Sequence, residues 1–141
     1  MKNRLTLLSA VLVFFGYFLI GCEGSSDDFD DLDIPLISNI PVSANVANAY
    51  SYVINANDFS TENLADLQFD SASFSCALTI ANYNGGDLSL AIFSEDSSAS
   101  FIRDISSSIV IAEIPEFKPR YLFVKMENFS GSMTLAVSNG D

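Results

Sequence analysis

The sequence predicts an all-β protein, an antiparallel β-sandwich of six to eight strands with a jelly-roll or Greek-key-like arrangement. From about residue 47, apolar and polar residues alternate with a period of two, as in strands that bury one face. Asn, Gly, Ser and Pro clusters separate these runs, as turns do in a sandwich. The 12 Phe and 5 Tyr residues are numerous enough to supply much of a two-layer core.

The first 33 residues are predicted to lie outside this sandwich. Lys2 and Arg4 precede an apolar run from Leu5 to Ile20, which is the pattern of a secretory signal peptide. The alternative is a transmembrane anchor, but the run is at the short limit for spanning a bilayer. It is also followed by acidic residues rather than by a basic stop-transfer cluster. We therefore predict a signal peptide over residues 1–21.

The end of this signal, Leu19-Ile20-Gly21-Cys22, resembles the lipobox of bacterial lipoproteins. The resemblance implies that the chain is cut before Cys22, that its sulfur is diacylated and that its new amine is acylated. Two or three acyl chains anchor a domain stably, at about 0.8 kcal/mol per buried CH₂. Glu23, in place of Asp, implies the outer membrane by the sorting rule of enteric bacteria. We expect a lipid-anchored protein of the bacterial cell envelope.

Residues 22–33 are predicted to be the lipidated cysteine and a flexible acidic tether, because Gly, Ser and self-repelling acids dominate EGSSDDFDDLD. A calcium loop is the alternative, but no register places the Gly and Glu that an EF-hand loop requires. No metal or cofactor is expected. The chain has 18 acidic and 6 basic residues, a net charge of −12, which argues against binding nucleic acid or lying flat on anionic lipid.

The sandwich domain is predicted over residues 34–141. Pro35 and Pro41 favour an extended segment or an edge strand at its start. Residues 57–69 allow one helical turn before a short strand, and the Ser-rich residues 94–107 predict a long loop with an edge strand. The strands are expected within residues 48–56, 73–82, 87–94, 107–114, 120–127 and 132–139.

Two turns are predicted between these strands. Residues 82–87 favour a hairpin turn, because Asn and Gly tolerate positive φ, and residues 129–132 favour another between the last two strands. Within residues 120–127, the run from Tyr121 to Met126 is apolar on both faces, which is typical of a central strand. Cys76 falls on an apolar face, so we predict a buried, inert thiol rather than a reactive or inter-chain one.

Three segments resemble the bacterial pre-peptidase C-terminal domain, over roughly residues 45–139. They are Asp87-Leu88-Ser89-Leu90, Tyr121-Leu122-Phe123-Val124 and the run from Ser130 to Val137. The sequence departs from that family at Ser89, where a second Asp is common, at Lys118-Pro119-Arg120, which replaces a Gly, and at Met133. The loss of the second Asp puts a family-type calcium site in doubt. The resemblance implies a non-catalytic accessory module with secretion, matrix-binding or polysaccharide-binding roles.

Catalysis is not expected. The chain has no His, which removes the usual general base and the Ser-His and Cys-His designs, and one cysteine besides Cys22 cannot build a zinc site. Neither a Walker A nor a GxGxxG motif occurs. A glycosidase pair of Asp87 with Glu95, Asp96 or Asp104 is the one enzymatic alternative, although such loop acids are usually only solvated.

The function predicted from these residues is a non-catalytic interaction module that binds a protein or polysaccharide partner through its loops. The candidate contacts are two loop aromatics and two cations: Tyr83, Phe117, Lys118 and Arg120. Loop aromatics, Phe129 among them, also commonly fill the end of a sandwich. The alternative function is a structural or accessory subunit of an envelope assembly that works by strand addition at an open sheet edge.

Overall fold

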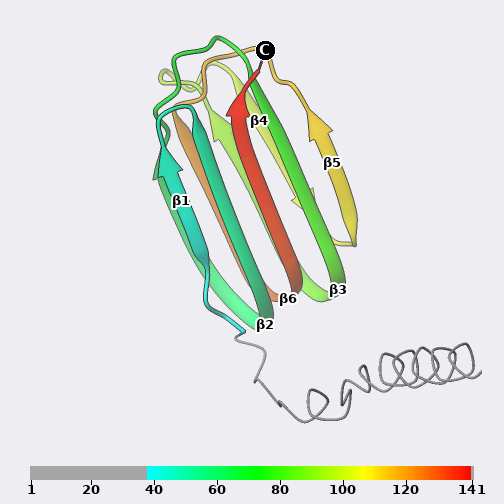
Figure 1. Ribbon diagram of the computed structural model, residues 1–141. Coiled ribbons are helices and arrows are strands. Elements are labelled where there is room, and N and C mark those ends of the chain that lie inside the picture. The colour runs from blue at the N-terminus through cyan, green and yellow to red at the C-terminus, as the bar shows by residue number, and fades with distance from the viewer. Residues whose placement is uncertain (1–37, 141) are drawn as a thin grey trace, which may run out of the picture. The chain divides into compact units, whose positions relative to one another are not determined.

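The computed structural model describes residues 38–140, which form one open antiparallel sheet of six strands and contain no helix (Figure 1). The prediction of an all-β fold is therefore confirmed. The predicted signal peptide, lipobox with Cys22 and acidic tether lie outside the described residues. The strands are β1 (Val42–Val46), β2 (Ala49–Asp66), β3 (Phe74–Phe93), β4 (Ser100–Ile105), β5 (Ile109–Glu113) and β6 (Tyr121–Asn139).

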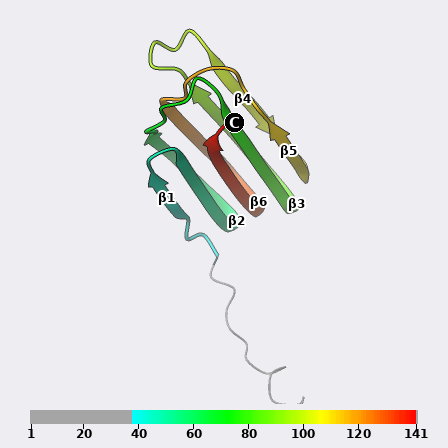
Figure 2. The same ribbon diagram turned by 45° about the horizontal axis from the view of Figure 1, so that its top comes forward.

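Three of the strands are long enough to serve two layers. β2, β3 and β6 have 18, 20 and 19 residues, against about 3–10 for most strands in globular proteins. The first parts of β2 and β3 pair with the second part of β6, and the pairing shifts register in mid-strand before the remaining parts pair. At these shifts the ribbons turn back at one end of the molecule (Figure 1, Figure 2), so the sheet folds over itself like a sandwich.

The two layers are named here by their strands. The first layer contains β1, residues 49–56, residues 131–139, residues 74–81 and β5, in that order across the sheet. The second layer contains residues 61–66, residues 121–127, residues 87–93 and β4. β6 is central in both layers, which confirms the central strand predicted at residues 120–127. β1 and β4 are edge strands, as the sequence predicted for their segments.

The core lies between the two layers and is a single cluster of buried apolar side chains. Phe74 of the first layer makes an edge-to-face contact with Phe101 of the second, at a ring-centroid distance of 6.4 Å. Cys76 is fully buried, as predicted. Burial disfavours its thiolate and raises the pKa of Cys76 to about 12, with the charge of Glu113 adding to the shift. The thiol is therefore inert at neutral pH.

The two predicted hairpin turns are wrong. Residues 82–87 lie inside β3 and residues 129–132 inside β6, and each is a bend that carries one strand from layer to layer. The bends do use residues that tolerate positive φ, as was expected of the turns. Asn82 has a φ of 52°, and Asn128, which directly precedes residues 129–132, has a φ of 49°. A left-handed residue permits either a hairpin or an out-of-plane bend, and long-range pairing with β6 decides between them.

The helical turn predicted within residues 57–69 is also wrong, because β2 continues to Asp66. Two polar contacts between the bends of β2 and β6 take the place of that turn. The Ser60 hydroxyl accepts a hydrogen bond from the backbone N–H of Asn128 at 2.9 Å. In return, the backbone N–H of Asp58 donates to Ser130 Oγ at 2.8 Å. A serine at the bend of β2 thus satisfies a backbone N–H at the bend of β6, and a serine at the bend of β6 satisfies one at the bend of β2.

Candidate functional site

Three loops lie at the end opposite the bends (Figure 1) and form the candidate site. They are residues 67–73, 94–99 and 114–120. Two adjoining open hollows, of about 370 and 540 Å³, lie among these loops. Glu95, Lys118 and Arg120 line both of them, so the last of the three loops provides the cations and the second an acid.

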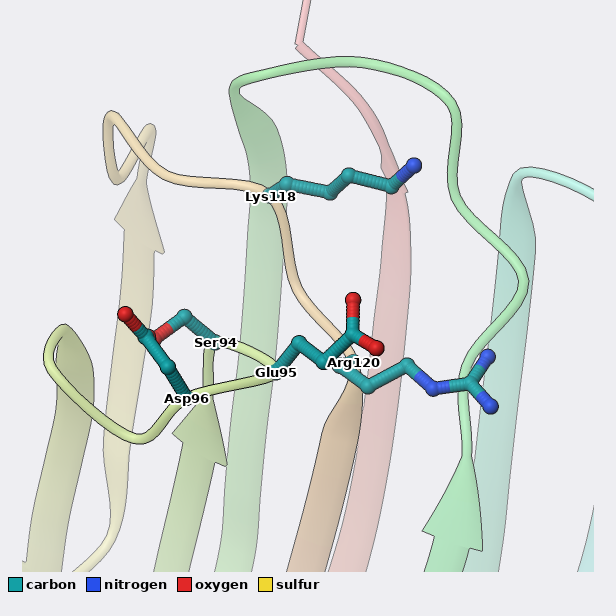
Figure 3. Close-up of a pocket in the computed structure, with 5 residues that line it drawn as sticks. All are labelled: Ser94, Glu95, Asp96, Lys118 and Arg120. Carbon is teal, nitrogen blue, oxygen red and sulfur yellow. The ribbon is translucent and has the colours of Figure 1, made fainter.

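The loop before β6 owes its shape to alternating burial. Phe117 packs edge-to-face on Phe74 with 5.1 Å between ring centroids, and Pro119 is buried. The residues between and after them, Lys118 and Arg120, therefore face outward, with Lys118 exposed and Arg120 half-buried. Figure 3 shows both cationic side chains extending to the same side of this loop, with the Glu95 side chain between them in that view.

Arg120 is fixed by its backbone and by one guanidinium nitrogen. Its N–H donates to the carbonyl of Phe93 at 2.8 Å, and its own carbonyl accepts from the N–H of Leu67 at 2.7 Å. Nη1 donates to the Leu67 carbonyl at 3.3 Å. These bonds join three loops or strand ends at one residue. The other guanidinium nitrogens remain available to a ligand, held in a direction set before it arrives.

Lys118 and Arg120 differ from the other described cations in their ion pairing. Arg103 contacts Glu113 at 2.5 Å, and Lys125 contacts Glu127 at 2.7 Å. Within residues 38–140, no carboxylate oxygen lies within 4.0 Å of the charged nitrogens of Lys118 or Arg120. Two cations without ionic partners thus stand together on an acidic protein, and an anionic group is the ligand that they would attract.

The acids beside these cations have different roles. Asp96 is engaged by its own loop, because Oδ1 accepts from Ser94 Oγ at 2.8 Å and from the hydroxyl and N–H of Ser98 at 2.7 and 3.0 Å. These bonds, those from Ser98 first, lower the pKa of Asp96 to about 2, so it stays ionised and orders the loop. Glu95 makes no hydrogen bond or ion pair within the described residues and is exposed at the hollow.

Of the four predicted contact residues, the structure brings Lys118 and Arg120 together at the hollows. Phe117 packs on Phe74 at the core and lines neither hollow, and Tyr83 lies elsewhere. Tyr83 lies in the bend of β3, where its hydroxyl donates to the carbonyl of Gly86 at 2.6 Å. Its ring lies 6.1 Å from that of Phe129, which is fully buried. These two aromatics fill the bend end of the sandwich. The sequence pointed to Glu95 only as a possible glycosidase acid and did not point to Leu67, because chain spacing does not reveal that either residue lies beside Arg120.

Two of the three carboxylate pairs considered for a glycosidase, Asp87 with Glu95 and Asp87 with Asp96, are not assembled. Phe93, at the loop end, lies six positions after Asp87, at the bend, which is about 20 Å of extended chain. Glu95 and Asp96 lie beyond Phe93, farther than the roughly 5–9.5 Å that such a pair requires. Asp104 is the nearer acid, and its Oδ1 accepts from Ser89 Oγ at 2.6 Å on the exposed face of β3 and β4.

Residues 38–140 contain no group of three or more Cys, Asp or Glu side chains placed to hold a metal ion. No helix in this part of the chain is long and apolar enough to cross a membrane. In comparisons with known proteins, no protein-family model matches the chain and no curated protein matches it. The resemblances to bacterial lipoproteins and to the pre-peptidase C-terminal domain therefore stay predictions.

Proposed function

We propose that the protein is a lipid-anchored, non-catalytic interaction module of a bacterial envelope, and that its loop end binds an anionic group of a polysaccharide partner. The observation that carries the proposal is the pair of cations Lys118 and Arg120, which face one open hollow and have no carboxylate partner in the described residues. A guanidinium fork and an ammonium together suit the carboxylate of a uronic acid unit.

The surrounding charge makes this binding local and salt-dependent. A chain with a net charge of −12 repels anions over most of its surface, so a polyanion gains contact energy only where cations stand free. Salt weakens the attraction between exposed charges, because it screens them over a Debye length of about 8–10 Å at 0.1–0.15 M ionic strength. The negative charge of Glu95, at the same hollow, repels an anionic ligand, so we expect a modest affinity. Removing that charge should make binding tighter.

The test is calorimetric titration with an oligouronate as the probe. Lys118→Gln and Arg120→Gln should each weaken binding by about tenfold, which corresponds to roughly 1.4 kcal/mol, and Glu95→Gln should strengthen it. Lys125→Gln is the matched control, because Lys125 is paired with Glu127 on the second layer. Equal affinity of the Lys118, Arg120 and Lys125 variants would contradict the proposal, as would binding lost only in Tyr83→Ala.

The lipid anchor, a proposal that rests on the sequence alone, is tested separately by replacing Cys22. Cys22→Ser should move the protein from the membrane fraction to the soluble fraction, since it removes the sulfur that would carry the lipid. Oligouronate binding by the released protein should be unchanged, because the loop end is formed by residues 67–120. A Cys22→Ser protein that stays uncut in the membrane would overturn the anchor and leave the loop-end proposal standing.

A further inference from the structure

The four edges of the folded sheet differ in how they are protected against pairing with another strand. Unprotected edges invite strand addition, and charged side chains are a common protection. The second-layer edges carry charges, with Glu62 and Asp66 on β2 and Arg103 and Asp104 on β4. On the first layer, β5 ends in Glu113. β1, Val42-Ser43-Ala44-Asn45-Val46, is the one edge strand of the described chain without a charged residue.

β1 is also apolar and exposed. All five of its residues are exposed, with Val42 at 66% and Val46 at 59% of their possible accessible surface. Val42 stands beside Val53 of β2, which is 45% exposed, on the outer face of the first layer. Within residues 38–140, β1 pairs only with β2. The edge of β1 that faces away from β2 therefore presents unpaired backbone N–H and C=O groups, with two exposed valines beside them.

Charge on the two layers is strongly unequal. Glu113 is the only charged residue in the strand segments of the first layer, whose outer face holds Val, Ala, Ser and Thr side chains in register across five strands. The strand segments of the second layer contain five acids and two cations, namely Glu62, Asp66, Asp87, Asp104, Glu127, Arg103 and Lys125. Two copies of so acidic a chain repel each other least when they meet through the first layer.

We propose that β1 is a homodimerisation edge, at which a second copy of this chain adds its own β1 antiparallel to form a continuous first layer of ten strands. The inference is independent of the loop-end binding proposed above, because no residue of β1 lines either hollow. A two-fold axis at Ala44 places Val42 opposite Val46 of the partner and Ser43 opposite Asn45. Each residue then meets one that faces the same side of the sheet, as an isologous contact requires.

The sequence of β1 fits this register better than it fits a charged or bulky partner. Ala44 at the axis meets its own copy with only a methyl group on each strand, while Val42 and Val46 form two symmetric apolar pairs. Five residues in this register would make about four to six backbone hydrogen bonds. Such an interface is small, so we expect a reversible, concentration-dependent dimer rather than an obligate one. Salt should strengthen it, because the net charge that separates two copies is then screened.

The experiment uses a cysteine at the two-fold axis of the full chain, expressed in its own compartment. Directly paired residues on antiparallel strands have Cβ atoms about 4.5–5.5 Å apart, and a disulfide needs about 3.5–4.5 Å, so a small shift of the two strands lets Ala44→Cys form a disulfide with its own copy. Ala112→Cys, which is also exposed and lies on the opposite edge strand β5, is the matched control. On non-reducing gels, Ala44→Cys should give several-fold more species of twice the monomer mass than Ala112→Cys.

Sedimentation of the purified chain provides a second measurement that does not depend on cysteine chemistry. Wild type should dimerise as its concentration rises, more so at high salt, and Ala44→Lys should stay monomeric with an unchanged circular dichroism spectrum. Equal cross-linking of the two cysteine variants would overturn the proposal. So would a wild-type protein that stays monomeric at high concentration and high salt, or an Ala44→Cys adduct with a different protein.

Discussion

Gly86 lies in the bend of β3, where the backbone of β6 passes close to it, and its replacement by alanine gives a sharp test of the fold. Gly86 has a φ of +83°, and a Cβ built there would lie 2.3 Å from the backbone oxygen of Asn128 and 2.6 Å from that of Glu127. Both oxygens belong to β6, the central strand of both layers. The clash therefore cannot be relieved by rotating a side chain.

The size of the effect follows from separating two contributions. An alanine at positive φ costs about 1–3 kcal/mol whatever the space around it. Gly85, the neighbouring residue, has a φ of +137° and no heavy atom within 4 Å of a built Cβ, so Gly85→Ala incurs only this first contribution. Gly86→Ala must in addition push the bend of β6 away from β3. We expect it to lower the free energy of unfolding by about 3–5 kcal/mol in total.

The assay is urea unfolding of the two variants and wild type, followed by circular dichroism. An extra loss of about 2 kcal/mol in Gly86→Ala should lower its urea midpoint by about 1 M relative to Gly85→Ala. A Gly86→Ala protein that fails to fold at all would agree with the prediction. Equal midpoints for the two variants would refute the close approach of β3 and β6, and with it the account of how the sheet folds over.

Four further predictions concern the core and the ion pair between β4 and β5. Tyr50→Phe and Tyr52→Phe should leave the free energy of unfolding unchanged or raise it by up to about 1 kcal/mol, because their hydroxyls are buried without a hydrogen-bond partner in the described residues; a loss in urea melts would contradict this. Burial raises the pKa of Tyr50 and of Cys76 to about 12, so stability should be intact below pH 9 and decrease as the pH rises toward 12, with Tyr50→Phe decreasing less. In a Cys22→Ser chain, Cys76 should react with a thiol reagent only after unfolding, and rapid labelling of the native protein would show that the core is open. Arg103→Ala should cost no more than about 1 kcal/mol, and less at high salt, since its ion pair with Glu113 is half exposed; a larger cost would implicate its stacking on Phe101, at 4.2 Å.

The alternation of apolar and polar residues was sufficient to predict strand identity and the buried faces. Tyr50, Tyr52 and Ile54 alternate with polar or exposed neighbours, and each is buried as that period requires. Strand length was not predictable from the same signal. Alternation is interrupted at a bend just as it is at a hairpin, and the residues that permit positive φ are the same in both. Only the pairing of both parts of β3 with β6, up to 65 residues away (Phe74 with Asn139), distinguishes them.

Part of the candidate site was visible in the sequence for a local reason. Lys118 and Arg120 alternate with Phe117 and Pro119, so a two-residue period predicts that the cations share the exposed side when the others are buried. What they face depends on other loops, since Glu95 and Leu67 reach Arg120 from segments 25 and 53 positions away. Tyr83 was grouped with them because it is also a loop aromatic, and residue type alone does not tell which end of a sandwich a loop occupies.

The distribution of charge along the chain does contain a signal for the bends, one that strand-by-strand reading does not use. Residues 42–57 have no charge, and charges begin at Asp58, at the bend of β2. Residues 71–86 are again neutral up to Asp87, just after the bend of β3, and residues 128–139 are neutral from the bend of β6 onward. Each switch coincides with a passage between layers. A long strand whose outward residues change from neutral to charged midway crosses from one environment to another, so the switch favours a bend over a hairpin. The same reasoning explains why the neutral segments gather in one layer: they are the parts of three strands that share a face, and that face has β1 at its edge.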